Sequence, residues 1–589
     1  MADLLAIIAH DRDRPSAADA LERLTATYES LRGPVPERHT VATEWAAVQV
    51  VDRPTPATIG LREDGAGWTA WAGPLADPAA ATAPLGELDG QFSLTRLEAD
   101  GETLRLATDP LGMKPLYVAE SGGMTFASSS ALVLAKHLRA APSRVGVESF
   151  LRTGNQFGQT TMWDGVERLL PAEALTFTAG GRSRGTYWQP TVEAAVRALD
   201  FDDTAAVCVE QASEAFGRRF GVLRPWLDLT GGFDTRLLAL VARGAGMDFL
   251  ANTSGPAFSE DVRIAKLIAA TAGWPWTHIE LHADWADGLP DRIGEAVAWG
   301  DCHLDALALT EVLEGHRVKA ETATVLLNGG GGEHYRDYPW GQELWAANRS
   351  TEVNFDRLIR WRVLSPLDLS PFREDPTPAV ADAARRELER RAEPFAGTPN
   401  TFQCDLLYAF KSTGHFGAYQ ACAGGSIHMD LPFYLKSVFT TAISAAPRHR
   451  NFHRLMMNRL DPVIAAIDTE TGGPATPVTL ANAYRFTPYF YRRGMRFAGR
   501  LRGRLLGTGE APLPEPTGRD LARARLISTL RADGRLDPSQ MRSAALYDPS
   551  RLTDQLDRAA DAPTTVDWSL IGRLLSVELA MQAVDVGLE

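Results

Sequence analysis

One short stretch, residues 226–242, constrains the fold of this chain more than any other. Residues 226–229 are mostly apolar and predict the end of a buried strand, Thr230-Gly-Gly232 predicts a tight turn, and Asp234 opens a helical pattern. Glycines let backbone N–H groups approach an oxyanion, and the first-turn donors of a helix favour negative charge there. The stretch therefore predicts an anion site within an α/β domain.

Asp234 needs a separate explanation, because a carboxylate does not itself bind phosphate. A bridging divalent cation, Mg²⁺ above all, accounts for a carboxylate beside a phosphate site. No Gly-Lys-Ser/Thr follows the turn, so it is not a Walker A loop. The alternative is a plain strand–helix turn in which a Thr or Asp side chain caps the helix.

Composition narrows the class of protein. At 589 residues the chain predicts two to four domains, and a formal charge of −14 argues against a general nucleic-acid binder. Its four cysteines are widely spaced, which fits a reducing compartment without a disulfide framework or a zinc site. We find no signal-peptide pattern and no apolar run of membrane-spanning length, and we expect a cytoplasmic protein without membrane contact.

The chain changes character twice along its length. Residues 1–190 are rich in short apolar segments between turn residues, interrupted by one helical pattern at Ala17–Leu31, and predict β-structure. After a helical segment at 194–222, strand-like and helical runs alternate, which predicts a parallel sheet with helices on both faces. From about residue 353 the pattern is almost wholly helical.

A second glycine cluster, residues 325–333, repeats the pattern of the first. An apolar strand ends in four glycines, among them Gly329 and Gly330, and the acidic Glu333 follows. Ligands of open α/β sheets bind beyond the carboxyl ends of the strands, so Asp234 and Glu333 could share one metal–polyphosphate group. The alternatives are a flexible hairpin turn with a solvated Glu333 and, for Ser259-Glu-Asp261 at the next helix start, a simple N-cap.

Several short strings, in order along nearly the whole chain, resemble the asparagine synthetase family. In the second part they are Asp228-Leu-Thr-Gly-Gly-Phe-Asp-Thr235, Ser259-Glu-Asp-Val-Arg-Ile-Ala265 and Leu327-Asn-Gly-Gly-Gly-Gly-Glu-His334. In the first part they are Leu88-Asp-Gly-Gln-Phe-Ser93, Asp109-Pro-Leu-Gly-Met-Lys-Pro-Leu-Tyr117, Phe126-Ala-Ser128, Trp163-Asp-Gly-Val-Glu-Arg-Leu-Leu-Pro-Ala172 and Tyr187-Trp188. Each string is weak alone, but their common order makes the resemblance specific.

The resemblance implies a fold. It predicts an α+β, glutaminase-like sandwich of the N-terminal-nucleophile type at residues 1–192. Residues 193–589 are then an α/β parallel-sheet synthetase domain of the adenine-nucleotide alpha-hydrolase kind, with a helical C-terminal part.

The resemblance also implies a reaction, an AMP-forming carbon–nitrogen ligation. A substrate carboxylate attacks the α-phosphate of ATP, and an amine then displaces AMP to give an amide. Mg²⁺ would be bound by Asp234 and Glu333 and would neutralise the leaving pyrophosphate. The residues implied for ATP and pyrophosphate are Leu229, Thr230, Gly231, Gly232, Phe233, Asp234, Thr235, Thr253, Gly329 and Gly330.

The chain departs from the family at its start. Glutamine-using members carry Cys after the initiator Met, whereas this sequence has Ala2, and its first cysteine is Cys208. Without that nucleophile we expect no glutamine hydrolysis. The amine is then free ammonia or part of the substrate, as in the β-lactam synthetases and lasso peptide cyclases that this chain resembles in lacking the Cys.

The sequence leaves open which residue is the base that must deprotonate the amine. The string ending in Pro432-Phe433 has His428 where many members have Glu, with Asp430 two residues on, and Tyr335 and Tyr338 are candidate partners. The alternatives are a structural histidine and aromatic core packing. The family's late lysine has no clear match near residues 469–473. The arginine run at 492–504 could supply a cation, or it is a solvated helix face or a docking surface.

Three functions follow, in order of preference. The first is intramolecular macrolactam formation in a peptide natural product, as in lasso peptide cyclases, with a leader-peptide-binding protein and a protease as possible partners. The second is ammonia-dependent amidation of aspartate or another small acid. The third is an inactive binding or scaffold protein, against which the retained Asp234 and Glu333 argue.

Overall fold

The computed structural model describes residues 3–10, 16–52, 59–65, 67–156, 158–280, 285–336, 350–423, 425–445, 450–488, 491 and 515–588. Ala2, Tyr338 and the arginine run at 492–504 lie outside the described residues. Within them, no helix is both long enough and apolar enough to cross a membrane.

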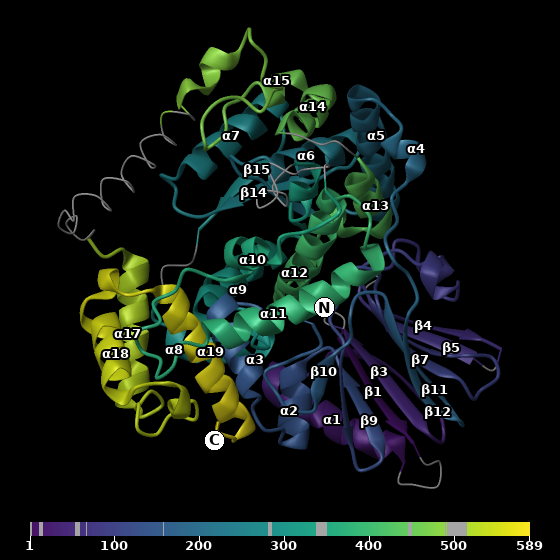
Figure 1. Cartoon of the computed structure of the whole chain (residues 1–589), viewed down its shortest axis with the longest axis vertical. Helices are drawn as coiled ribbons and strands as arrows, with labels where there is room; N and C mark the ends of the chain where they lie inside the picture. The colour runs from purple at the N-terminus through teal and green to yellow at the C-terminus, as the bar shows by residue number, and fades with distance from the viewer. Residues whose placement is uncertain are drawn as a thin grey trace.

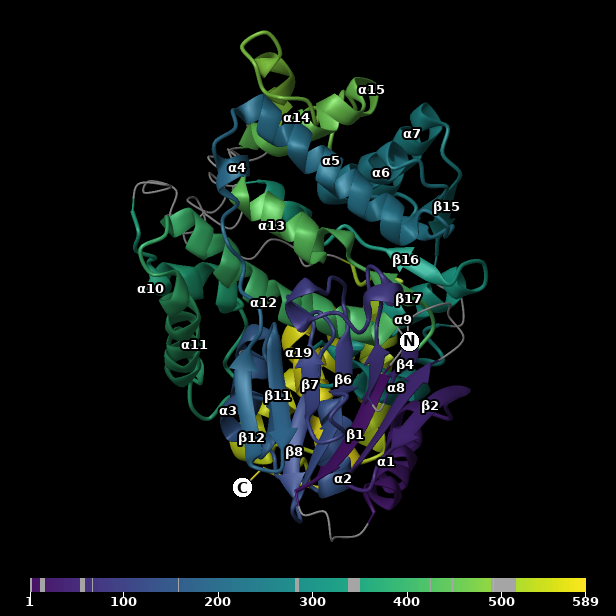
Figure 2. The ribbon, with the colours of Figure 1, turned by 90° about the vertical axis from the view of Figure 1, so that its right-hand side faces the viewer.

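The first part of the chain forms two six-stranded antiparallel sheets (Figures 1 and 2). The first sheet has, in order, β10 (Val166–Arg168), β8 (Tyr117–Ser121), β9 (Met124–Ser128), β1 (Asp3–Ala9), β3 (Ala46–Asp52) and β2 (Glu37–Ala42). The second has β12 (Gly181–Thr186), β11 (Glu173–Thr178), β7 (Leu104–Thr108), β6 (Ser93–Leu97), β5 (Gly67–Ala72) and β4 (Ile59–Asp64). The predicted β-structure of residues 1–190 is confirmed.

Strand β1 shows why the two sheets stack. Leu4, Ala6 and Ile8 belong to a core shared with the second sheet, while Leu5 and Ile7 face the core that includes the neighbouring helices. Successive side chains of a strand point to opposite faces, so a strand that is apolar at every position is buried on both sides. The helices of this part are α1 (Ala17–Arg32), α2 (Ala131–Leu138) and α3 (Arg144–Thr153).

The second part is built on a five-stranded parallel sheet, as the alternation of strands and helices predicts. Its order is β15 (Trp276–Ile279), β14 (Leu250–Ser254), β13 (Trp226–Asp228), β16 (Val325–Leu327) and β17 (His428–Asp430), and every neighbouring pair is parallel. The helices that precede or connect its first four strands are α4 (Ala194–Arg197), α5 (Phe201–Phe220), α6 (Asp234–Gly244), α7 (Glu260–Ala272), α8 (Leu289–Gly300) and α9 (Ala306–Ala320).

The region after residue 353 is mainly helical but also supplies β17, which the sequence pattern does not reveal. Three residues are too few to show a period of two, and only the pairing with β16 defines them as a strand. The helices are α10 (Phe355–Leu358), which runs into a π-helical turn at Ile359–Val363, α11 (Thr377–Ala392), α12 (Asn400–Ala423), α13 (Lys436–Ser444), α14 (Arg450–Leu460), α15 (Pro462–Ala465), α17 (Gly518–Ala532), α18 (Pro549–Asp561) and α19 (Trp568–Val584).

The largest hydrophobic core joins the two parts of the chain. It contains Leu5 of β1, Phe150 of α3, Leu307 of α9 and Leu575 of α19, all 0–1% exposed. Helices α17 and α19 pack against α8, α19 also contacts α9, α2 and α3, and α18 packs on α17, at the lower left of Figure 1. This hydrophobic core is therefore continuous across the predicted domain boundary at residue 192.

Candidate functional site

The first glycine turn lies at the carboxyl end of β13, the central strand of the parallel sheet. Two threonine hydroxyls shape it: Thr235 Oγ1 accepts the N–H of Thr230 at 3.0 Å, and Thr230 Oγ1 accepts the N–H of Gly232 at 3.1 Å. The N–H of Gly231 donates to Asp261 Oδ1 of α7 at 2.9 Å. The N–H groups of Gly231 and Gly232 are predicted to bind phosphate. In this structure they bind oxygens of the chain itself.

The second glycine turn follows β16, the neighbour of β13, and the two turns touch. A Cβ added to Gly329 would lie 2.9 Å from the backbone nitrogen of Thr235, and one added to Gly332 would lie 2.8 Å from Cβ of Asp234. Gly331 has a φ of +94°, a conformation that favours glycine. Glycine is therefore required here by close approach of the two loops as well as by backbone conformation.

The two predicted metal ligands face this junction. Glu333 is 5% exposed; its Oε2 accepts the N–H of Gly331 at 2.9 Å and its Oε1 the hydroxyl of Tyr408 at 3.2 Å. Asp234 Oδ2 accepts from Arg336 Nη2 at 2.6 Å, and its buried Oδ1 has no hydrogen-bond partner among the residues that the structure describes. The structure brings Asp234, Glu333 and both turns together.

Electrostatics at Asp234 favour an additional cation. Burial raises the pKa of Asp234 to about 7, and the nearby carboxylates of Glu333 and Glu470 add to the rise while Arg336 opposes it. Among the described residues, no three His, Cys, Asp or Glu side chains are grouped to hold a metal ion. Mg²⁺ is commonly bound by one or two carboxylates completed by phosphate oxygens and water, so the unpartnered oxygen of Asp234 with Glu333 fits that ion.

Glu470 is an acidic neighbour that the sequence analysis does not identify. Its backbone N–H donates to the carbonyl of Gly231 at 3.4 Å. Burial raises the pKa of its side chain, and the charge of Asp261 with the hydrogen bond between the two carboxyl groups raises it further. It lies in the segment 469–473, where the family would place a lysine, and only the packing of that segment on the first turn reveals it.

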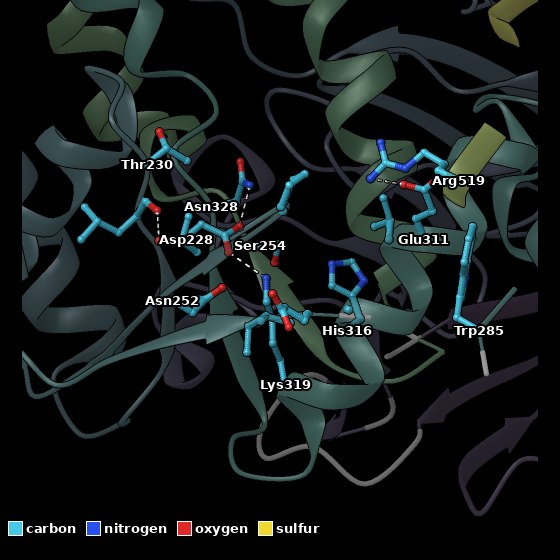
Figure 3. A pocket seen from close by; sticks show the side chains of 18 of the residues that line it. Asp228, Thr230, Asn252, Ser254, Trp285, Glu311, His316, Lys319, Asn328 and Arg519 are labelled. Carbon is cyan, nitrogen blue, oxygen red and sulfur yellow. Dashed lines mark hydrogen bonds and ion pairs between the residues drawn. The ribbon is translucent and has the colours of Figure 1, made fainter. Parts of the chain in front are cut away.

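A cavity of about 920 Å³ opens beside the two turns, within the size range of small-molecule sites (Figure 3). Four residues predicted to bind the nucleotide line it: Leu229, Thr230, Thr235 and Thr253. Residues that line it without having been predicted include Asp228, Asn252, Ser254, Trp285, Glu311, His316, Lys319, Asn328, Tyr419 and Arg519.

Part of the cavity lining is a polar cluster around Asp228. Lys319 Nζ of α9 lies 2.8 Å from Asp228 Oδ1, and Asn328 Nδ2 donates to Asp228 Oδ2 at 3.0 Å, as Figure 3 shows. Burial alone would raise the pKa of Asp228, but the charge and hydrogen bond of Lys319 bring it below its usual value. Burial and Lys319 lower the pKa of His316 to about 3, so this imidazole is neutral at pH 7.

The candidate base residues lie away from the cavity wall. His428 and Asp430 are 3% and 2% exposed, and His428 Nε2 is 3.2 Å from Asp430 Oδ1. Met429 between them lines the cavity, and alternation along β17 turns its two neighbours to the other face. Tyr335 is 1% exposed and packs edge-on against Phe433. Their role in catalysis stays a prediction.

The remaining predicted residues hold the turns in place. Phe233 has the guanidinium of Arg454 4.7 Å from its ring centroid. Gly330 donates its N–H to Asn328 Oδ1 at 2.9 Å, and a Cβ on it would meet Leu431 and Phe416 within 3 Å.

Comparison with known proteins gives two matches in sequence. A family model of the glutamine amidotransferase domain matches residues 80–188. The chain is 29% identical over 161 residues to "Asparagine synthetase [glutamine-hydrolyzing] 3" of Bacillus subtilis, a match that covers 27% of this chain and 26% of the relative. The chain thus matches about a quarter of the length of that relative. Both findings support an asparagine synthetase-like chain with a glutamine amidotransferase-type N-terminal part.

Solved structures add little. A glutamine phosphoribosylpyrophosphate amidotransferase from B. subtilis, complexed with ADP and GMP, is 10% identical, with a TM-score of 0.22 over 47% of this chain and 65% of that one. A structure described as the allosteric regulatory enzyme of purine biosynthesis is 10% identical, with a TM-score of 0.18 over 42% of this chain and 59% of that one. Scores this low do not establish a shared fold.

Proposed function

We propose that this protein is an ATP-dependent amide ligase. It would form an acyl-adenylate and pyrophosphate from a substrate carboxylate and ATP, and an amine would then displace AMP. The observation that carries the proposal is the junction of the two glycine turns at neighbouring strand ends, where Asp234 and Glu333 meet beside the cavity. The similarity to an asparagine synthetase supports the same class of reaction.

Each part of the junction has a role in this proposal. Thr230, Thr235 and Thr253 would bind and orient the nucleotide from the cavity wall. The N–H groups of Gly231 and Gly232 would exchange their present acceptors for phosphate oxygens. Asp234 and Glu333 would hold Mg²⁺, which, when bound, supplies positive charge to the leaving pyrophosphate.

We further propose that the amine belongs to the substrate, so that the product is a macrolactam within a peptide. No cysteine occurs among the strands of the N-terminal sandwich, nor anywhere before Cys208, so these sheets offer no thiol for glutamine hydrolysis. A leader-peptide-binding protein and a protease would then act with this enzyme, and we propose a cytoplasmic location, which its widely spaced cysteines support.

A second candidate, ammonia-dependent amidation of a small acid such as aspartate, is favoured by the similarity to asparagine synthetase. Both candidates require adenylation, and they differ in the source of nitrogen. The inactive scaffold is the contrasting possibility, in which neither ATP nor pyrophosphate binds.

Pyrophosphate release tests these alternatives. Release that requires ATP, Mg²⁺ and a peptide with a free N-terminus and an internal Asp or Glu supports the cyclase, and release with aspartate and ammonium supports the second candidate. Asp234→Asn and Glu333→Gln should abolish release while the melting temperature stays within a few degrees. Asp248→Asn is a matched control, because its carboxylate is exposed and pairs with the exposed Arg224. Wild-type protein that binds no ATP would overturn the proposal.

A further inference from the structure

We propose that Arg336 is a pyrophosphate-binding residue, held against Asp234 in this structure and transferred to phosphate oxygens when a divalent cation takes Asp234. The inference rests on the proposed function. It adds to the site a positively charged side chain that the sequence pattern does not identify. It is drawn from the position of one guanidinium between the two glycine turns.

Arg336 joins the turns directly. It follows the 3₁₀ turn Gly332–Tyr335 that ends the second glycine cluster, and its Nη2 reaches Asp234 Oδ2 at 2.6 Å, at the N-terminus of α6. Its side chain is 30% exposed and that of Asp234 is 24% exposed. The pair is therefore open to a ligand and is not sealed within the core.

The other basic groups around the first turn are committed to backbone or aromatic partners. Arg236 is 0% exposed and donates to the carbonyls of Gly231, Ile467 and Asp468. Arg454 donates to the carbonyl of Pro474 and lies over the rings of Phe233 and Phe486. His453, 3.7 Å from Asp234 Oδ1, is buried, and its pKa lies well below the usual value, so it is neutral.

Arginine suits such a transfer chemically. Its guanidinium carries five N–H donors in a planar fork that matches carboxylate and phosphate oxygens alike. A fork of this kind can bind a carboxylate and an anion beside it through different N–H groups. A divalent cation at Asp234 and Glu333 would repel the guanidinium and weaken its bond to Asp234, and a pyrophosphate group would offer it new acceptors.

The transfer predicts effects of opposite sign on two affinities. Arg336 should lower the affinity for a divalent cation added without pyrophosphate, and it should raise the affinity for a divalent cation bound together with pyrophosphate. Replacing Arg336 by Gln should strengthen binding of Mn²⁺ alone several-fold. The same change should weaken binding of magnesium pyrophosphate about tenfold or more, the loss expected for a charge-assisted hydrogen bond. Arg336→Lys should fall between the wild type and Arg336→Gln.

Binding measurements without turnover test the inference. Mn²⁺ alone would be followed by electron paramagnetic resonance, and magnesium pyrophosphate by titration calorimetry, on folded proteins verified by thermal melting. Arg243→Gln is the matched control, because Arg243 also pairs with an aspartate, Asp461, at 2.8 Å but lies at the far end of α6. Unchanged pyrophosphate affinity in Arg336→Gln would overturn the inference alone, whereas wild-type protein that binds neither probe would overturn the proposed function.

Discussion

Gly329 packs directly against the backbone of Thr235, and this contact joins the two glycine turns. A Cβ at Gly329 would lie 2.9 Å from the nitrogen of Thr235 and 3.0 Å from the carbonyl carbon of Asp234. Neither backbone atom can rotate away, so Gly329→Ala should force the turns apart. We expect a loss of about 1–3 kcal/mol in unfolding free energy, as for overpacked sites, and a larger loss of ATP affinity. Urea denaturation and nucleotide titration measure the two effects.

Gly294 provides the control for that substitution. It lies inside α8, and a Cβ there would meet no atom within 4 Å. Alanine is preferred over glycine in a helix interior by about 0.5–1 kcal/mol, so Gly294→Ala should raise the melting temperature slightly and leave ATP affinity unchanged. If both variants behave alike, the approach of Gly329 to Thr235 is not tight in solution.

The sequence predicts this junction well because its signals are local. A strand, glycines and an acidic residue recur within a dozen residues at Asp234 and again at Glu333, and the rule that ligands bind at carboxyl ends of parallel strands relates the two. The same local logic predicts α1, β1, α7 and the parallel sheet. Alternation and turn residues are visible in a single sequence without knowledge of the fold.

The residues and elements that the sequence does not predict depend on contacts between distant segments. Arg336 pairs with a residue 102 positions away, and Lys319 with one 91 positions away, so neither stands out in the sequence as a site residue. β17 is a strand only because β16 lies beside it. The core that joins β1 to α19 likewise depends on packing between segments more than 500 residues apart, which no local pattern encodes.

Lys319 is expected to stabilise the polar cluster of the cavity lining through Asp228. Lys319→Met removes the ammonium and leaves the carboxylate with its hydrogen bond from Asn328, which should cost about 1–3 kcal/mol of unfolding free energy at pH 7. The double variant Lys319→Met with Asp228→Asn should recover part of that loss, because the unpaired charge is gone. Chemical denaturation of the single and double variants measures the coupling.

The pH dependence of that pair has a definite sign. The pKa of Asp228 is lowered in the folded protein, so its contribution to stability is present above the unfolded value near 3.9 and is lost as the pH falls. Without Lys319, burial should raise this pKa instead. The difference in stability between wild type and Lys319→Met should therefore be largest at pH 7 and shrink as the pH falls from the raised pKa of the variant to the lowered pKa of the wild type. A difference independent of pH would exclude the ion pair as its cause.

His428 can be tested both as a base and as a structural residue. It is buried on β17 beside Asp430, which Arg219 also approaches at 3.5 Å, and the cavity is lined by Met429 instead. We expect His428→Gln to lower the unfolding free energy by about 1–3 kcal/mol and to leave ATP affinity unchanged. A loss of turnover of about 10²–10⁴-fold in a variant of wild-type stability would instead identify the general base. Thermal melting and turnover, measured on the same preparation, distinguish the two results.

Asp3 is predicted to anchor the N-terminal sandwich. Its carboxylate, 1% exposed, is bound by Lys114 Nζ at 3.0 Å, Arg32 Nη1 at 3.0 Å and the hydroxyl of Tyr28 at 2.7 Å. Burial would raise the pKa of Asp3, but these partners hold it well below its usual range. Asp3→Asn should cost about 3–5 kcal/mol at pH 7, as expected when a buried ion pair loses one member.

The same group should make the protein sensitive to acid. Because the pKa of Asp3 is lowered on folding, its contribution is complete above the unfolded value near 3.9 and declines as the pH falls below it. The stability difference between wild type and Asp3→Asn should therefore narrow in acid. Glu29→Gln is the control: Glu29 pairs with the exposed Arg38 at 3.5 Å, and such a surface pair contributes about 0–1 kcal/mol. Equal losses in the two variants at pH 7 would show that the buried network around Asp3 does not stabilise the sandwich.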